Sequence, residues 1–154
     1  MVISRYMKKD VVSIHADATI RDAAHIFVKK HVGMLPVIDD NGKPIGVVSL
    51  RDMLTLELPD FVNFVNDMDF VQDFGAVEST RPSPAALARS VKKLMKPPFT
   101  VPQDCGLLRA YALMLQHNLH DLLIVSADGK LVGIASRVDV GRAILASWSK
   151  IEKK

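Results

Sequence analysis

The apolar residues in the first third of the chain follow two different periods. Residues 11–14 (VVSI), 35–39 (LPVID) and 44–49 (PIGVVS) are short apolar runs bounded by turn residues, which is typical of strands. Between the first two runs, apolar side chains recur at the spacing of a helix, and Thr19 with Asp22 forms a capping-box pattern at its start. A further helix is expected to begin directly after the third run. The predicted order is therefore β-α-β-β-α.

The same order is predicted again in the second half of the chain. When the sequence is shifted by 87 residues, positions 11–52 fall on positions 98–139 without a gap, and apolar positions mostly stay apolar. A unit of this length that occurs only twice indicates a duplicated small domain rather than a solenoid. The elements expected in the second copy are strands at 99–101, 122–126 and 131–136, a helix from about Gly106 to His117, and a final helix that runs to about Trp148.

The two copies share one polar motif, Gly-x-x-Ser-x-x-Asp. Ser49 with Asp52, and Ser136 with Asp139, can each form a capping box where a strand passes into a helix, and capping alone explains their spacing. Capping does not explain the glycine of each motif, because glycine inside a strand usually marks a bulge or a close approach of something else to the backbone. A hydroxyl and a carboxylate at a helix N-terminus also suit the phosphate and ribose of a nucleotide. The residues alone leave both interpretations open.

The segment between the copies differs from both. Residues 58–77 (LPDFVNFVNDMDFVQDFGAV) place Phe61, Phe64, Val65 and Met68 at helical spacing among aspartates, which predicts an amphipathic helix. This helix is expected to cover the protein's own core or a homodimer contact, with docking of another protein as the alternative. After a loop at 78–84, Ser83 and Pro84 should begin a helix over 85–94. The expected domains are 1–58 and 95–154, with 59–94 as connector.

The stretch VGMLPVIDDNGKPIGVVSLRDML resembles a CBS domain, and the second copy resembles its partner in a tandem CBS pair, also called a Bateman module. The resemblance covers about 7–58 and 95–148. It implies an α+β fold in which two CBS domains, each β-α-β-β-α, are related by a pseudo-twofold axis. It also implies adenine nucleotides or related adenosyl ligands bound in clefts between the domains, with the aspartate of each motif on the ribose hydroxyls. Such modules sense a ligand and do not catalyse a reaction.

The resemblance also assigns residues to two clefts. In the second cleft the resemblance is weaker, because Cys105, His120 and Leu123 depart from the family pattern. Ser136 with nearby Arg137 or Lys30 is expected to hold a phosphate in the first cleft. The first cleft combines Ala18, Ala23, Val32, Gly33, Ile134, Ser136, Arg137 and Asp139. The second combines Val47, Ser49, Arg51, Asp52, Cys105, Ala110, Leu119 and His120.

Composition excludes several other classes of protein. A chain of 154 residues that is 49% hydrophobic can bury a core, and a charge of +3 without basic runs interleaved with aromatics gives little support for nucleic-acid binding. The first residues have no apolar segment of a secretory signal, and a single cysteine allows no internal disulfide, so the chain is expected to be cytoplasmic. His117 and His120 have no third ligand at a familiar spacing, so no metal site is predicted. Catalytic motifs are also missing from the sequence.

The sequence therefore predicts a regulatory, energy-sensing module that binds AMP, ADP or ATP, with S-adenosylmethionine as an alternative adenosyl ligand, and that regulates a partner protein. Two alternatives stay open: a ligand-free interaction module that acts through the Phe-rich segment, and a nucleic-acid binder that uses the basic excess. Apolar helix faces around Leu54, Leu58, Ile144, Leu145 and Trp148 predict a homodimer.

Overall fold

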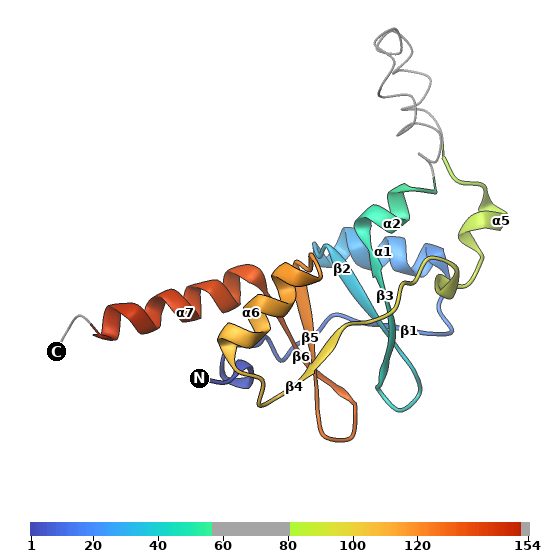
Figure 1. The fold of residues 1–154 in the computed structure, drawn as a ribbon. Coiled ribbons are helices and arrows are strands. Elements are labelled where there is room, and N and C mark those ends of the chain that lie inside the picture. The colour runs from blue at the N-terminus through green and yellow to red at the C-terminus, as the bar shows by residue number, and fades with distance from the viewer. Residues whose placement is uncertain (57–80, 152–154) are drawn as a thin grey trace, which may run out of the picture.

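The structure is a computed structural model, and it describes residues 1–56 and 81–151. The Phe-rich segment and its expected helix lie outside these residues, as does Leu58. Within the described ranges the chain forms two units with the same order of elements, and each unit contains one three-stranded sheet (Figure 1). The α+β class that the resemblance implies is confirmed, as is the element order predicted from the two hydrophobic periods.

Unit 1 has the predicted order β-α-β-β-α. Strand β1 runs parallel to β2, β2 runs antiparallel to β3, and a left-handed turn at Gly42, with φ of +78°, closes the hairpin. The expected capping box opens α1, since the Thr19 hydroxyl accepts from the N–H of Asp22 at 3.2 Å and the Asp22 carboxylate accepts from the N–H of Thr19 at 2.9 Å. The elements are β1 (Ile14–His15), α1 (Ile20–Lys30), β2 (Met34–Ile38), β3 (Pro44–Ser49) and α2 (Leu50–Leu54).

Unit 2 repeats this topology. Its strands have the order β4-β5-β6, with a parallel pair followed by an antiparallel pair, and Gly129 takes the left-handed turn with φ of +79°. The helix expected from about Gly106 to His117 is confirmed, with these two residues as its caps. The elements are β4 (Thr100–Pro102), α6 (Leu107–Gln116), β5 (Asp121–Val125), β6 (Leu131–Ser136) and α7 (Arg137–Ile151).

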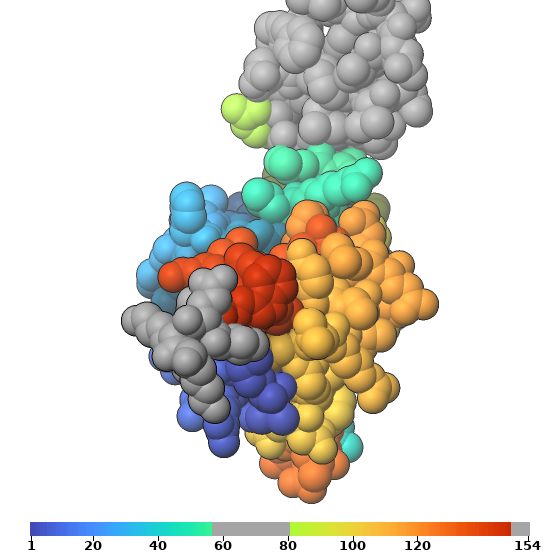
Figure 2. All heavy atoms as spheres, turned by 60° about the vertical axis from the view of Figure 1, so that its left-hand side comes forward, coloured from blue at the N-terminus to red at the C-terminus, as the bar shows by residue number. Residues whose placement is uncertain are grey.

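The packing of the cores does not follow the order of the sequence. Ile3, in the short 3-10 helix η1 (Ile3–Arg5), is fully buried in the core of unit 2, and its N–H donates to the carbonyl of Cys105 at 2.8 Å. Val91, in the 3-10 helix η3 (Val91–Lys93), is fully buried in the core of unit 1, and its N–H donates to the carbonyl of Ala18 at 2.9 Å. Each unit is therefore completed by residues that precede the other unit in the sequence. Figure 2 shows the first residues, in blue, directly against unit 2, in yellow.

The segment before η3 differs from its prediction. Ser83 caps a helix with Pro84 in its first turn, as expected, but this helix, α5 (Pro84–Leu87), ends after four residues instead of continuing through 94. The chain leaves the helix because the carbonyl of Arg89 accepts a hydrogen bond from the N–H of Ile20 at 2.9 Å, and Ser90 pairs with Thr19. Hydrogen bonds to unit 1 thus replace the intrahelical bonds that the local sequence favours.

Candidate functional site

The serine and aspartate of each Gly-x-x-Ser-x-x-Asp motif form a reciprocal capping box. In unit 2 the N–H of Asp139 donates to Oγ of Ser136 at 3.1 Å, and the N–H of Ser136 donates to Oδ2 of Asp139 at 3.0 Å. In unit 1 the N–H of Asp52 donates to Oγ of Ser49 at 3.0 Å, and the N–H of Ser49 donates to Oδ2 of Asp52 at 2.9 Å. These bonds satisfy N–H groups at the start of α2 and α7 and orient both carboxylates.

The glycine of each motif is explained by packing, because another segment of the same chain crosses the strand at that glycine. Lys8 exchanges two backbone hydrogen bonds with Ile134, at 2.8 and 3.0 Å, and this pairing lays Met7 over Gly133. A Cβ on Gly133 would lie 2.2 Å from Sδ of Met7. In unit 1 the crossing segment brings Met95 to Gly46, where a Cβ would lie 2.6 Å from Sδ. The close approach predicted by each glycine is therefore made by the chain itself.

The crossing segments also bring one lysine to each aspartate. Nζ of Lys96 lies 2.9 Å from Oδ1 of Asp52, and Nζ of Lys8 lies 3.8 Å from Oδ2 of Asp139. Burial raises the pKa of Asp52, but hydrogen bonds from Ser49 and Lys96 outweigh burial and leave the pKa lowered. Burial likewise raises the pKa of Asp139, but the bonds from Ser136, helped by Lys8, leave its pKa lowered. Both groups are thus held as carboxylates.

Sequence reasoning missed these lysines although a signal is present. Met7-Lys8 and Met95-Lys96 form a repeated pair at a shift of 88 residues, one residue out of register with the 87-residue repeat that begins at position 11. An alignment that allowed a one-residue gap before the first strand would have extended the duplication to these residues. Their conformations in the two units match, since both lysines pair with the residue that follows the motif glycine.

A cleft of about 250 Å³ lies between the two units and brings together several residues expected in the first cleft. Val32 and Gly33 come from the turn after α1, and Ile134 comes from β6 of unit 2. Asp139 lies beside this cleft, because Lys8, one of its lining residues, is ion-paired with it. Sequence reasoning did not select the other lining residues, which are Lys8, Asp10, Val11, Val12, His31, Met34 and Asp121.

Ser136 adjoins the cleft through its bonds to Asp139, whereas Ala18, Ala23 and Arg137 are not among the lining residues. Ala23 has no exposed surface and therefore offers none to a ligand in this structure. Ala18 packs against the core of unit 1. Arg137 is directed to unit 2 itself, where its guanidinium donates to the carbonyls of Met114, in the last turn of α6, and Leu119, just after that helix. A cation there compensates the partial negative charge of the helix end. Neither Arg137 nor Lys30 lines the cleft.

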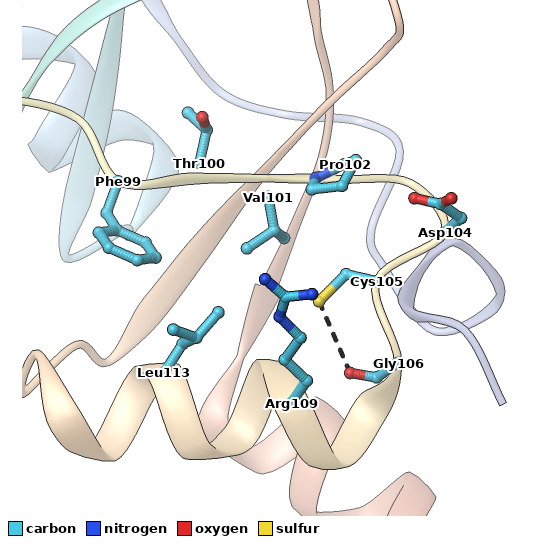
Figure 3. Close-up of a pocket in the computed structure, with 9 residues that line it drawn as sticks. All are labelled: Phe99, Thr100, Val101, Pro102, Asp104, Cys105, Gly106, Arg109 and Leu113. Atoms are coloured by element: carbon cyan, nitrogen blue, oxygen red, sulfur yellow. Dashed lines mark hydrogen bonds between the residues drawn. The ribbon is translucent and has the colours of Figure 1, made fainter.

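The residues expected in the second cleft have different surroundings in the part of the chain that the structure describes. Val47 exchanges backbone hydrogen bonds with Lys96 at 2.9 and 2.8 Å, Arg51 and His120 are exposed, and Leu119 is half-buried. Cys105 lines a pocket of about 340 Å³ that consists of unit 2 residues between β4 and α6 (Figure 3). Burial raises the pKa of the Cys105 thiol against the opposing effect of Arg109. Ala110 is fully buried in the core of unit 2.

One cluster with metal-ligand chemistry occurs among the described residues, and sequence reasoning did not find it. His15, Asp17 and Asp40 place ligand atoms within 4.8 Å of one another. Nδ1 of His15 accepts from the N–H of Asp17 at 3.1 Å, which leaves Nε2 to donate to Asp40 at 2.7 Å. The cluster is therefore explained as a hydrogen-bonded surface network that needs no ion.

Comparisons with known proteins agree with this geometry. The family model described as CBS domain matches residues 3–58 and 91–146. The Arabidopsis thaliana protein CBSX2, chloroplastic, is 36% identical over 141 residues, which is 86% of this chain and 58% of that protein. Its relative CBSX1 is 31% identical over 148 residues, 90% of this chain and 61% of that protein. This chain therefore spans about three fifths of the length of both plant proteins.

Solved structures show the same fold. A crystal structure of CBSX2 in complex with AMP has a TM-score of 0.70 and 30% identity, and the match covers 94% of this chain and 96% of that chain. The CBS domain pair of protein MJ0100, in complex with 5-methylthioadenosine and S-adenosyl-L-methionine, has a TM-score of 0.67 at 17% identity and covers 96% and 98%. Within residues 1–56 and 81–151, the helices are too short or too polar to span a bilayer.

Proposed function

The chain belongs to the CBS-domain family as a tandem pair, and from this we propose that it is a non-catalytic regulatory module that binds an adenine nucleotide or a related adenosyl ligand in the first cleft. In this proposal the ligand changes how the pair engages a regulated protein. The cytoplasm is its proposed location. The AMP complex of CBSX2 supports the ligand class, since that chain is 30% identical.

The observation that carries the proposal is the composition of the first cleft. Apolar Val32 and Ile134 come from different units and can flank a flat base, while Gly33 leaves room beside them, because no atom lies within 4 Å of a Cβ placed there. The Asp139 carboxylate beside the cleft is oriented by its capping box and keeps 24% of its side chain exposed. An oriented, accessible carboxylate suits the two hydroxyls of a ribose.

The second cleft is proposed to be unused. The Asp52 side chain is only 9% exposed, and the 2.9 Å ion pair with Lys96 already occupies the atom Oδ1. His120 stands at the position that corresponds to Gly33, so the second cleft carries a large side chain where the first carries none. Binding at Asp52 would require breaking its ion pair with Lys96, and we expect one ligand for each chain.

Ligand binding can be tested with a pair of matched variants. AMP at about a hundred times its Kd should stabilise the protein by roughly 2.7 kcal/mol, whereas GMP should have little effect. Gly33→Trp should fill the first cleft and abolish the calorimetric signal, because the position is open and the fold should tolerate the ring. His120→Trp is the equivalent change in the second cleft and should leave both affinity and stoichiometry unchanged.

These measurements can also reject the proposal. No melting-temperature shift with AMP, adenosine or S-adenosylmethionine would contradict it. Two ligands for each chain, or binding that survives Gly33→Trp but is lost in His120→Trp, would place the ligand in the other cleft.

We further propose that the chain is a homodimer. On α7, which projects from the body of the molecule (Figure 1), Val138, Leu145 and Trp148 are 64%, 55% and 59% exposed. Ile144, which was expected on this free face, is instead buried in the core of unit 2. A twofold contact between helices would cover such residues.

Light scattering at micromolar concentration should give the mass of two chains. Leu145→Glu should shift it toward one chain, because the contact would bury an unpaired carboxylate. Leu115→Glu, on α6, is the matched control and should leave the mass unchanged. A wild-type mass of one chain would contradict the homodimer.

A further inference from the structure

The charges around the first cleft differ from those expected of a phosphate site. Asp10 and Asp121 line it, and Lys8 is the one lysine or arginine among its lining residues. Lys8 is already ion-paired with the Asp139 carboxylate beside the cleft. Among the described residues that line it, carboxylates therefore outnumber ammonium groups.

The nearby helix ends do not reverse this balance. The turn that lines the cleft, His31 to Met34, directly follows the C-terminus of α1, where the partial charge of the helix is negative. The N-terminus of α7 has a positive partial charge, but its capping box already sets the Asp139 carboxylate against it. The guanidinium of Arg137, expected on a phosphate, is hydrogen-bonded instead to the carbonyls of Met114, in α6, and Leu119, just after it.

Asp121 holds the central position in this arrangement. It begins β5, pairs with Ser136 of the motif, and is half-buried between the units. Met34, its counterpart at a shift of 87 residues, lines the same cleft from unit 1, so the two equivalent positions face one cavity with one apolar and one acidic side chain. Burial raises the pKa of Asp121. The charges of His120 and Lys8 oppose this rise, and the charge of Asp139 adds to it. Asp121 therefore interacts electrostatically with all three groups.

We infer that Asp121 determines specificity in the first cleft by disfavouring phosphate-bearing ligands and favouring adenosyl ligands that carry a neutral or positively charged group on the ribose. This inference rests on the proposed function, because it concerns the choice among adenosyl ligands in that cleft. A carboxylate on the wall repels each added phosphate charge and attracts a sulfonium or ammonium group, and a partly buried site screens these interactions less than bulk water does.

The test is a calorimetric comparison of adenosine, AMP, ADP and S-adenosylmethionine with wild type and Asp121→Asn. Affinity for wild type should fall from adenosine through AMP to ADP. Asp121→Asn should raise the affinity for ADP by about three- to tenfold and the affinity for AMP by less. It should lower the affinity for S-adenosylmethionine by about three- to tenfold. Adenosine should change by less than about twofold, since it carries no charge. Salt should reduce all these differences.

Opposite responses separate a charge effect from a structural one. A distorted cleft would move all four affinities in the same direction, and that result would overturn the inference, as would equal affinities in wild type and variant. Asp128→Asn removes the same charge from the exposed β5–β6 turn and should change no affinity. If none of the four compounds binds to wild type, the proposed function itself fails. If they bind and ADP is the tightest for wild type, the inference alone is wrong.

Discussion

Gly133→Ala should lower the free energy of unfolding by about 1–3 kcal/mol, since the added methyl group overfills a packed contact. Its Cβ would lie 2.2 Å from Sδ and 2.7 Å from Cγ of Met7, so the Met7 side chain or the segment that carries it must shift. That segment carries Lys8, whose two backbone hydrogen bonds to Ile134 hold it on unit 2. Urea denaturation would measure the loss, with a fall in melting temperature of roughly 2–4 °C for each kcal/mol.

Two further variants make this experiment specific. Gly33→Ala is the matched control and should be neutral or slightly stabilising, since no atom lies within 4 Å of the new Cβ. Met7→Ala removes the clashing atoms beyond Cβ, so combining it with Gly133→Ala should cost less than the sum of the single changes, with a coupling of about 0.5–3 kcal/mol. Additive costs would show that the glycine serves another purpose.

Asp139→Asn should weaken binding of AMP by about ten- to a hundredfold, because a carboxylate that accepts hydrogen bonds from the ribose hydroxyls contributes roughly 1.5–3 kcal/mol. The amide keeps the shape of the side chain, and its oxygen can still accept the N–H of Ser136. The loss of stability should therefore stay at or below about 1 kcal/mol. Calorimetry with AMP, beside melting curves, measures both effects.

Asp52→Asn is the internal control for this prediction. Asp52 has the same capping box as Asp139, but its side chain is 9% exposed and paired with Lys96 at 2.9 Å. The change should cost at least as much stability, because the ion pair that it breaks is shorter and more buried than the pair of Asp139 with Lys8, and should leave AMP affinity unaltered. If both variants lose stability and neither loses affinity, the repeated motif is a folding signal and its ribose role is wrong.

The duplication and the order of the elements were determined by the sequence itself. Hairpins with glycine at the turn, apolar faces at helical spacing, and Ser-x-x-Asp and Thr-x-x-Asp capping boxes all depend on residues a few positions apart. Such local hydrogen bonds and periods leave a pattern in the sequence that needs no knowledge of the fold. The predicted β3 and β6 strands, at 44–49 and 131–136, accordingly have the bounds found in the structure.

Only the tertiary structure decided what lies against each motif. The motif glycines predicted a close neighbour but not which one, because Met7 and Gly133 are separated by most of the chain and no local pattern links them. Lys8 and Lys96 reach the two aspartates by the same crossings, and Arg89 ends α5 by bonding to Ile20. These contacts form because the segment that precedes each unit in the sequence packs on the other unit.

The difference between the clefts was likewise decided in three dimensions. The sequence marks the second site as the weaker match, but it does not show that Lys96 lies 2.9 Å from Asp52 while Lys8 lies 3.8 Å from Asp139. The family resemblance assigned Arg137 to a phosphate, but its guanidinium donates to the carbonyls of Met114, in the last turn of α6, and Leu119, just after that helix. The position of a long charged side chain is set by the partners that the fold brings near it, and residue spacing does not contain that information.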